Sequence, residues 1–398
     1  MTISLDSSAD VVIVGGGAIG SATAYYLSMM GKFAPGRIVI VERDTSYAEC
    51  STARSAGGIR AQFSTPQNIA LSKVTLNVIR NLKQIFGADA DVGFKEQGYL
   101  VLATNDGAGT LRANHVVQQA NGGDIELLDQ DDLARRFPWL NVDGIALGAF
   151  GRSGEGWLDP SIMMSLFRKA AQAHGVIVLN DQVVGIEHDA TKVSAVRLAS
   201  GKRITCGALV NAAGHAGGKL AALAGIELPV EPRKRFVYVM DCREATPALH
   251  AAPLTTDASG VWFRPEGRQF ITGISPDDTD EPPVGDLDAI DYGPYENIVW
   301  PGVAHRVPAF EAVKMTGAWA GYYDYNTLDQ NAIIGPHPEL ANFYFANGFS
   351  GHGFQQSGGT GQAIAELIVH GGFRAIDLAC FGYERIRRKE PLFELNIF

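Results

Sequence analysis

The chain has 398 residues, of which 46% are hydrophobic and 19% are charged, and its formal net charge at pH 7 is −10. This length allows two domains with substantial cores, and the negative charge argues against nucleic acid as a partner. No stretch approaches the roughly 18 consecutive apolar residues of a membrane-spanning helix. Because the given sequence does not open on a basic segment with an apolar core, we expect no secretion.

The cysteines are scattered and form no C-x-x-C pair, and no histidines lie at metal-ligand spacing. This pattern favours a reduced compartment and a protein without a structural metal. We therefore expect a cytoplasmic location, no membrane span and no metal site.

The first predicted element is a buried parallel strand at 11–14, which runs directly into the motif Gly15-x-Gly17-x-x-Gly20 and then into a helix. Gly15 allows a tight turn, Gly17 lets the backbone approach a pyrophosphate, and Gly20 lets the helix pack close to the strand. The phosphates would lie at the helix N-terminus, where N–H groups and the helix dipole favour an anion.

A second strand, at 37–41, ends at Glu42, whose carboxylate can accept hydrogen bonds from both hydroxyls of an adenosine ribose. A loop of small and hydroxyl residues follows at 43–60 and contains Arg54 and Arg60. Such a loop can approach a flat cofactor ring closely, so we assign it to the site and not to a solvated surface. This order of elements predicts a dinucleotide-binding domain.

An amphipathic helix is predicted from Thr65 to Phe86, and the pattern then changes near residue 92. A strand at 94–103 and an acid-capped helix after Asp129 indicate an excursion into a second domain. The chain returns through a helix beginning at Pro160 and strands at 176–179, 182–187, 192–198 and 208–210, the last of which ends in small residues at 211–218.

The stretch 229–317 is rich in alternating β-formers and is assigned to a substrate domain, with a surface loop predicted in its acidic, proline-bearing part at 276–294. A strand at 342–346 then runs into a second glycine-rich turn at 347–361, which offers another helix N-terminus to the cofactor. The basic stretch at 385–389 predicts a solvated face.

Four motifs together resemble the D-amino-acid oxidase superfamily of flavoproteins: the glycine motif with Glu42, Ser51-Thr-Ala-Arg-Ser-Ala-Gly, Asn211-Ala-Ala-Gly and Gly348-Phe-Ser-Gly-His-Gly-Phe. The resemblance implies FAD and not NAD, and a Rossmann-type α/β FAD-binding domain interleaved with an α+β substrate domain built on a β-sheet. It places the FAD-binding domain at 1–90, 151–225 and 325–398, and the substrate-binding domain at 91–150 and 226–324.

The resemblance also implies which residues contact FAD. The glycine motif would hold the pyrophosphate, Glu42 the ribose, and the 51–56 loop the isoalloxazine ring, while the turn at 348–355 would cover the pyrimidine end. The implied cofactor-binding residues are Gly15, Gly17, Ala18, Ile19, Gly20, Glu42, Arg43, Ser51, Thr52, Arg54, Ser55, Ala56, Val183, Val184, Ala213, Gly214, Gly348, Ser350, Gly351, His352, Gly353, Phe354 and Gln355.

Substrates of this superfamily are usually amines with a carboxylate, which a bidentate arginine suits best. The arginine candidates are Arg54, Arg60, Arg235 and Arg264. Arg235 matches a position near the substrate carboxylate in the D-arginine dehydrogenase branch, and its alternative is a surface basic cluster. The predicted catalytic residues are Arg54, Arg235, Tyr322, Tyr323 and His352. The alternative for His352 is a structural role, which we predict for His215.

Three positions depart from the superfamily pattern. Tyr322 stands where monomeric sarcosine oxidases carry the cysteine that bonds to the flavin, so we expect non-covalent FAD. A position near Ile271 lacks the lysine associated with oxygen activation, which favours a dehydrogenase over an oxidase. Gln355 replaces a lysine that helps to hold the substrate carboxylate.

The resemblance therefore implies an FAD-dependent oxidoreductase acting on a CH–NH or CH–NH2 donor, such as an N-methyl or N-alkyl amino acid, an opine or a D-amino acid. Hydride would pass from the carbon next to a neutral amine nitrogen to flavin N5, and the imine would hydrolyse in water. The electron acceptor would be O2, a quinone or a flavoprotein. The alternative is an FAD-retaining assembly or chaperone-like factor for a respiratory complex.

Overall fold

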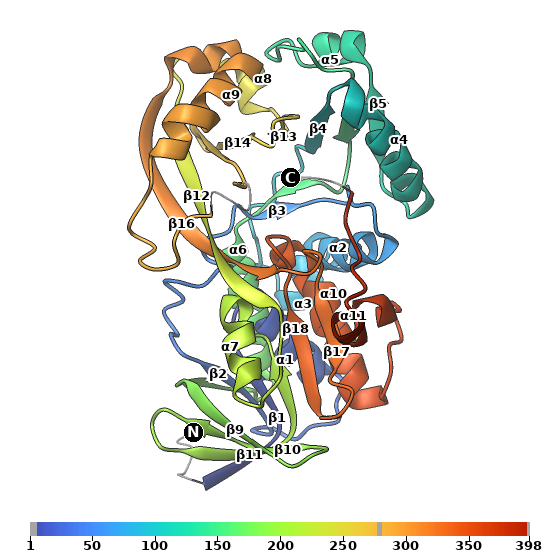
Figure 1. Cartoon of the computed structure of the whole chain (residues 1–398), viewed down its shortest axis with the longest axis vertical. Coiled ribbons are helices and arrows are strands. Elements are labelled where there is room, and N and C mark those ends of the chain that lie inside the picture. The colour runs from blue at the N-terminus through green and yellow to red at the C-terminus, as the bar shows by residue number, and fades with distance from the viewer. Residues whose placement is uncertain (1–5, 277–280, 396–398) are drawn as a thin grey trace.

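The computed structural model describes residues 6–276 and 281–395. Its strands form two sheets of eight strands each and a small ribbon of β3 (Gly58–Ile59) and β7 (Gly156–Trp157). Figure 1 shows the first sheet in the lower half of the molecule, near the N-terminus, and the second in the upper half. The arrangement confirms the predicted fold class, a Rossmann-type α/β domain interleaved with a sheet-based α+β domain.

The first sheet has a parallel core in the order β18, β11, β1, β2, β8; β17 pairs antiparallel with β18, and β10 and β9 extend antiparallel from β11. Its central strands are buried, which explains their unbroken runs of valine and isoleucine. The strands are β1 (Asp6–Val14), β2 (Ile38–Glu42), β8 (Ile177–Asn180), β9 (Val183–His188), β10 (Val193–Leu198), β11 (Arg203–Asn211), β17 (Ile333–Pro336) and β18 (Phe343–Asn347).

Helix α10 (Gly353–His370) packs against α1 (Ala18–Met29) and α2 (Pro66–Arg80), and α1 also contacts α6 (Pro160–Ala173). Glycines make this packing close. A Cβ on Gly361 would lie 2.6 Å from the backbone carbon of Ala22, and one on Gly359 would lie 2.8 Å from a methyl of Leu71. The residues of the glycine-rich turn therefore also act as helix-packing residues.

The predicted helix from Thr65 to Phe86 is two helices, because α2 ends at Arg80 and α3 (Leu82–Phe86) begins after Asn81. The predicted helix starts after Asp129 and at Pro160 are confirmed. Asp129 accepts an N-capping hydrogen bond at the start of α5 (Gln130–Arg136), and Asp159, which was not predicted as a cap, does the same at the start of α6. The other helical segments are α4 (Asn105–Ala120), η1 (Gly214–Ala216), α7 (Gly217–Ala222), α8 (Pro247–His250), the π-helical turn η3 (Tyr295–Val299), α9 (Trp300–Arg306), η4 (Pro308–Ala312), η5 (Ala379–Phe381) and α11 (Glu384–Arg388).

The second sheet runs in the order β16, β12, β15, β14, β13, β4, β6, β5, and its pairs are antiparallel except for β13 with β4. The strand predicted at 94–103 is regular only from Tyr99, where β4 begins. The strands are β4 (Tyr99–Ala103), β5 (Ile125–Leu128), β6 (Leu147–Gly151), β12 (Val230–Asp241), β13 (Leu254–Thr256), β14 (Trp262–Glu266), β15 (Gln269–Gly273) and β16 (Lys314–Asn326).

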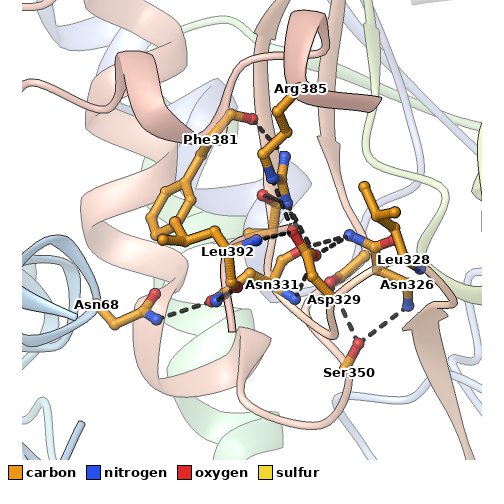
Figure 2. A network of polar contacts seen from close by, with 11 residues as sticks. Asn68, Asn326, Leu328, Asp329, Asn331, Ser350, Phe381, Arg385 and Leu392 are labelled. Atoms are coloured by element: carbon orange, nitrogen blue, oxygen red, sulfur yellow. Dashed lines mark hydrogen bonds and ion pairs between the residues drawn. The ribbon is translucent and has the colours of Figure 1, made fainter. Parts of the chain in front are cut away.

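Arg385 on α11 is buried, which corrects the prediction of a solvated basic face for this residue. Its guanidinium donates two hydrogen bonds to Asp329, at 2.9 and 3.1 Å, and the Asp329 side chain is fully buried (Figure 2). Asp329 also accepts hydrogen bonds from the side chain of Asn326 and the backbone of Asn331 and Leu392. This network joins the C-terminal segment to the turn after β16.

The C-terminal segment then rises to the junction of the two halves of the molecule (Figure 1). There the carboxylate of Glu394 accepts hydrogen bonds from the backbone N–H groups of Ser64 and Thr65 and from the side chains of Ser64 and Asn68. A carboxylate at this position also complements the dipole of α2, which begins at Pro66. The segment is thereby fixed along one edge of a cavity between the two halves of the molecule, and Glu394 forms part of the wall of this cavity.

Candidate functional site

A cavity of about 1000 Å³ lies where the first sheet meets the long strands β12 and β16 of the second. This volume is at the upper end of the range for ligand pockets and suits a dinucleotide together with a small substrate. All the predicted cofactor-binding residues line the cavity except Gly20 and Gly348, and all five predicted catalytic residues line it.

The glycine motif forms the first wall. Gly15 has φ +101°, and a Cβ there would lie 2.2 Å from the carbonyl oxygen of Ala212, so the position admits only glycine. A Cβ on Gly20 would lie 1.9 Å from the carbonyl oxygen of Gly15. Gly20 therefore serves helix–strand packing, while Gly17 is the N-cap residue of α1 and lines the cavity.

Glu42 lies at the end of β2 and lines the cavity. Its two carboxylate oxygens accept hydrogen bonds from the N–H groups of Gly16, at 2.8 Å, and Asp44, at 3.0 Å. A carboxylate has about four lone-pair positions, so these two bonds leave capacity for a ribose hydroxyl. Val183 and Val184 at the start of β9 line the same end of the cavity.

The 51–56 loop forms the next part of the wall. Within the described residues the hydroxyl of Ser51 is buried without a hydrogen-bond partner. The hydroxyl of Thr52 accepts a hydrogen bond of 3.1 Å from the N–H of Ala18, which ties the loop to the first turn of α1. A buried hydroxyl without a partner on a cavity wall is what a polar ligand would satisfy.

The second glycine-rich turn leads into α10, and Ser350, Gly351 and Gly353 line the cavity. Gly348 faces the protein: its N–H donates to the carboxylate of Asp324 at 2.9 Å, and the N–H of Phe349 donates to the same oxygen at 3.2 Å. Desolvation raises the pKa of Asp324 to about 6, although both N–H groups oppose the shift. Asp324 thus fixes the shape of the turn.

His352 immediately precedes α10, and its ring lies 5.6 Å from that of Phe63. Its Nε2 is buried without a hydrogen-bond partner among the residues that the structure describes. Burial, reinforced by the positive charge of Arg60, lowers the pKa of His352 to about 4. The imidazole is therefore neutral at physiological pH.

The arginine candidates differ in what their guanidinium groups contact. Arg54 donates to the carbonyl oxygens of Ala48, at 2.7 Å, and Ala320, at 2.9 Å, and so holds its own loop against β16. Arg264 does not line the cavity; it donates two hydrogen bonds, at 3.1 and 2.8 Å, to the carbonyl of Ala56. Both residues support the backbone of the predicted flavin-facing loop.

Arg60 lies on the cavity wall with its guanidinium carbon 4.8 Å from the ring centre of Phe63 and 5.8 Å from that of Tyr99. Its backbone N–H donates to the side chain of Gln355 at 2.8 Å. The two rings and a hydrogen bond of 3.4 Å from its Nε to the carbonyl oxygen of Gln62 restrict the position of the guanidinium. A guanidinium held in this way is prepared for bidentate binding of a carboxylate.

The two tyrosines predicted at the substrate have different partners. Tyr322 is buried, and its hydroxyl is hydrogen-bonded to the backbone of Gly285. The ring of Tyr323 lies under the guanidinium of Arg235, 5.3 Å from its carbon, and burial raises the pKa of the Tyr323 phenol. Arg235 is also paired with Glu281, so the predicted surface basic cluster is wrong for this residue.

Sequence reasoning missed several residues of the site. His215, predicted to be structural, lines the cavity 3.2 Å from the guanidinium of Arg43, and burial lowers its pKa to about 4. Tyr99 and Phe63 also line the cavity, and nothing in their local sequence pattern separates a cavity wall from a core. Ile271 is buried in β15 and does not line the cavity, whereas Ile274 and Ser275, just beyond this strand, do. The expectation of a dehydrogenase stays a prediction.

These observations fit FAD. A continuous cradle is formed by Gly15, where no side chain fits, by the N-terminus of α1 and by the Ser51 hydroxyl, which has no hydrogen-bond partner among the described residues. Glu42 lies at one end of this cradle. Over residues 6–276 and 281–395 there is no group of three metal-ligating side chains. Within the same residues no helix has both the length and the apolarity to cross a membrane.

Comparison with known proteins agrees with the cradle. A family model described as FAD dependent oxidoreductase matches residues 10–367. The chain is 41% identical to FAD-dependent oxidoreductase domain-containing protein 1 of Xenopus laevis, with 98% of this chain and 85% of that protein covered. It is 26% identical to mitochondrial sarcosine dehydrogenase of Mus musculus, with 92% of this chain and 40% of that protein covered. Its fold is similar to L-proline dehydrogenase from P. horikoshii, with a TM-score of 0.85, 24% identity and coverage of 97% and 100%.

Proposed function

The chain belongs to the DAO family of FAD-dependent oxidoreductases, and from this premise we propose that it oxidises the C–N bond of a small amine that carries a carboxylate. The substrate class covers N-alkyl and primary amino acids. FAD, when bound, would accept the hydride, which carries both electrons, from the carbon next to nitrogen. Water then adds to the imine, which releases an amine and a carbonyl compound.

The observation that carries this proposal is the stacked arginine at the substrate end of the cavity. Arg60 offers a planar cation next to the aromatic rings of Phe63 and Tyr99, in a cavity that Trp262 also lines. A cation of fixed plane beside apolar surface suits a small amino acid, whose carboxylate needs a bidentate partner and whose alkyl part needs burial. We assign the substrate carboxylate to Arg60.

The same wall favours the neutral amine that the reaction needs. A protonated nitrogen has no lone pair to stabilise the iminium that forms as the hydride leaves. The positive guanidinium of Arg60 and the surrounding apolar surface both disfavour an ammonium group nearby. Burial keeps the imidazole of His352 neutral, so this ring adds no charge to the wall. These residues therefore orient the substrate and hold it deprotonated, and no dedicated base is required.

The test uses the FAD-loaded protein, its Arg60→Gln variant and, as a control, Arg152→Gln, an exposed arginine paired with Asp124. Each is mixed anaerobically with N-methylglycine at increasing concentration, and the flavin absorbance is followed. Loss of a charge-assisted bidentate pair raises the half-saturating concentration for Arg60→Gln by about 10- to 100-fold. The control remains at the wild-type value. Equal half-saturation in wild type and Arg60→Gln would contradict the assignment. The electron acceptor, O2 or a quinone or flavoprotein, is identified by supplying each to the reduced protein.

A further inference from the structure

A segment of the substrate domain, residues 281–291, is held along β12 and β16 by buried side chains; we call it the strap. It falls in the predicted surface loop at 276–294, of which residues 277–280 lie outside the described residues. The ammonium group of Lys234 donates hydrogen bonds to the carbonyl oxygens of Asp286 and Ala289, both at 2.6 Å. The hydroxyl of Tyr238 donates to the carbonyl oxygen of Asp291 at 2.7 Å, and the hydroxyl of Tyr322 is hydrogen-bonded to the backbone of Gly285. Val284 and Gly285 of the strap line the cavity.

The strap begins with Glu281, whose carboxylate accepts two parallel hydrogen bonds from Arg235, at 2.7 and 2.8 Å. The side chains of Arg235 and Glu281 are only 9% and 11% exposed. A second guanidinium, that of Arg233, lies 3.7 Å from the same carboxylate. This is the fork-on-fork geometry with which arginine binds any carboxylate, so Glu281 occupies the carboxylate-binding side of Arg235, which itself lines the cavity.

Arg235 belongs to the substrate end of the cavity. The guanidinium of Arg235 lies over the ring of Tyr323. Burial raises the pKa of the Tyr323 phenol, and the positive charges of Arg235 and Arg60 oppose this shift. Arg235, Arg60 and Tyr323 all line the cavity. Arg60 lies over the rings of Phe63 and Tyr99. Arg235 is paired with a carboxylate of the protein itself.

We propose that Glu281 restricts the enzyme to substrates with one carboxylate, because it occupies Arg235 and repels a second carboxylate from that side of Tyr323. This inference rests on the proposed function, in which Arg60 takes the first carboxylate. N-methylglycine meets the restriction. N-(carboxymethyl)glycine, which differs by one additional carboxylate, does not: its second carboxylate must displace Glu281 and leave that charge without its partner.

The test compares the dissociation constants of N-methylglycine and N-(carboxymethyl)glycine from the change in flavin absorbance under anaerobic conditions. Wild type is expected to prefer N-methylglycine. In Glu281→Gln the ratio moves toward the dicarboxylate by at least about tenfold, because Arg235 gains a ligand carboxylate in place of its own. The double variant Glu281→Gln with Arg235→Gln loses this gain. An unchanged ratio in a folded Glu281→Gln protein would overturn the proposal.

A second measurement separates this inference from the proposed function. Glu281→Ala leaves Arg235 unpaired, and acetate is expected to raise the thermal midpoint of this variant above the effect of chloride at equal ionic strength. Wild type and the variant that also lacks Arg235 show no such acetate effect. If neither amine binds any of these proteins, the proposed substrate class is wrong. An acetate effect in Glu281→Ala would in that case still support Glu281 as the occupant of a carboxylate site. The absence of an acetate effect in Glu281→Ala would show that ligands cannot reach Arg235 and would overturn the inference.

Discussion

Replacement of Glu155 by glutamine tests how burial of one carboxyl group beside the cavity wall makes the free energy of unfolding depend on pH. Glu155 is 0% exposed, and its carboxylate accepts hydrogen bonds from the N–H of Ala61, at 2.7 Å, and the side chain of Gln62, at 2.8 Å. It thereby fixes the segment that follows Arg60. Burial raises the pKa of Glu155 to about 7 from 4.5, with both hydrogen bonds opposing the shift.

The sign of the pH dependence follows from this shift. Because the folded-state pKa of Glu155 lies above the unfolded value, its stabilising contribution is fully present below about pH 4.5 and is lost as the pH rises through about 7. The shift is worth roughly 3 kcal/mol, of which about 2 to 3 kcal/mol is lost between about pH 5 and 8. Glutamine does not titrate, so Glu155→Gln gains this amount relative to wild type over the same interval.

The assay is urea unfolding of the FAD-saturated proteins at several pH values, with the free energy of unfolding of the variant compared with that of wild type at each pH. Other titrating groups, including His352 and Asp324, are common to both proteins and cancel in the difference. Gln118→Met is the control, because it alters a buried amide bonded to Phe63 without removing a titrating group. A difference between Glu155→Gln and wild type that stays constant across this interval would refute the reasoning.

Two further predictions concern the cofactor cradle and the C-terminal segment. Gly15→Ala places a methyl group 2.2 Å from a carbonyl oxygen at φ +101° and is expected to lose most bound FAD, measured as the ratio of flavin to protein absorbance. The control is Gly31→Ala, which is also at positive φ but in open space and is expected to keep FAD. Asp329→Asn leaves the buried guanidinium of Arg385 without its counter-charge and is expected to lower the free energy of unfolding, measured by urea unfolding, by about 3 to 5 kcal/mol. The control Arg387→Gln removes an exposed charge and is expected to change this free energy by less than about 1 kcal/mol. Retention of FAD by Gly15→Ala, or equal stability of the two charge variants, would contradict these accounts.

The sequence was sufficient for the parts of the site that depend on local backbone geometry. The strand, the glycine motif, the helix and Glu42 follow one another within a short stretch, and each requirement is visible as a residue type at a fixed spacing. The same holds for the turn before α10. These segments line one cavity because the carboxyl ends of parallel strands meet at one edge of a sheet.

The roles of the charged side chains could not be predicted in this way, because they depend on partners distant in sequence. Arg235 and Glu281 are 46 residues apart, and nothing in the pattern of either segment indicates that they pair. Arg264 looked equivalent to Arg60 as a candidate, yet its guanidinium supports the carbonyl of Ala56. Arg385 lay in a stretch of basic residues that predicted solvent exposure, and only the fold brings Asp329 to it. Hydrophobic periodicity reports which face of an element is buried and carries no information about which ion pairs form.

The central claim is that the flavin of this protein is reduced by a small amine carboxylate, and the most direct measurement is anaerobic mixing of the purified, FAD-loaded protein with N-methyl amino acids, D-amino acids and opines. Our account predicts bleaching of the visible flavin absorbance by N-methyl or primary amino acids with one carboxylate, weak or no bleaching by the dicarboxylic opines, and formation of the matching carbonyl product. Absence of bleaching by every one of these compounds, with FAD bound and the fold intact, would contradict the claim and would favour an FAD-retaining assembly factor.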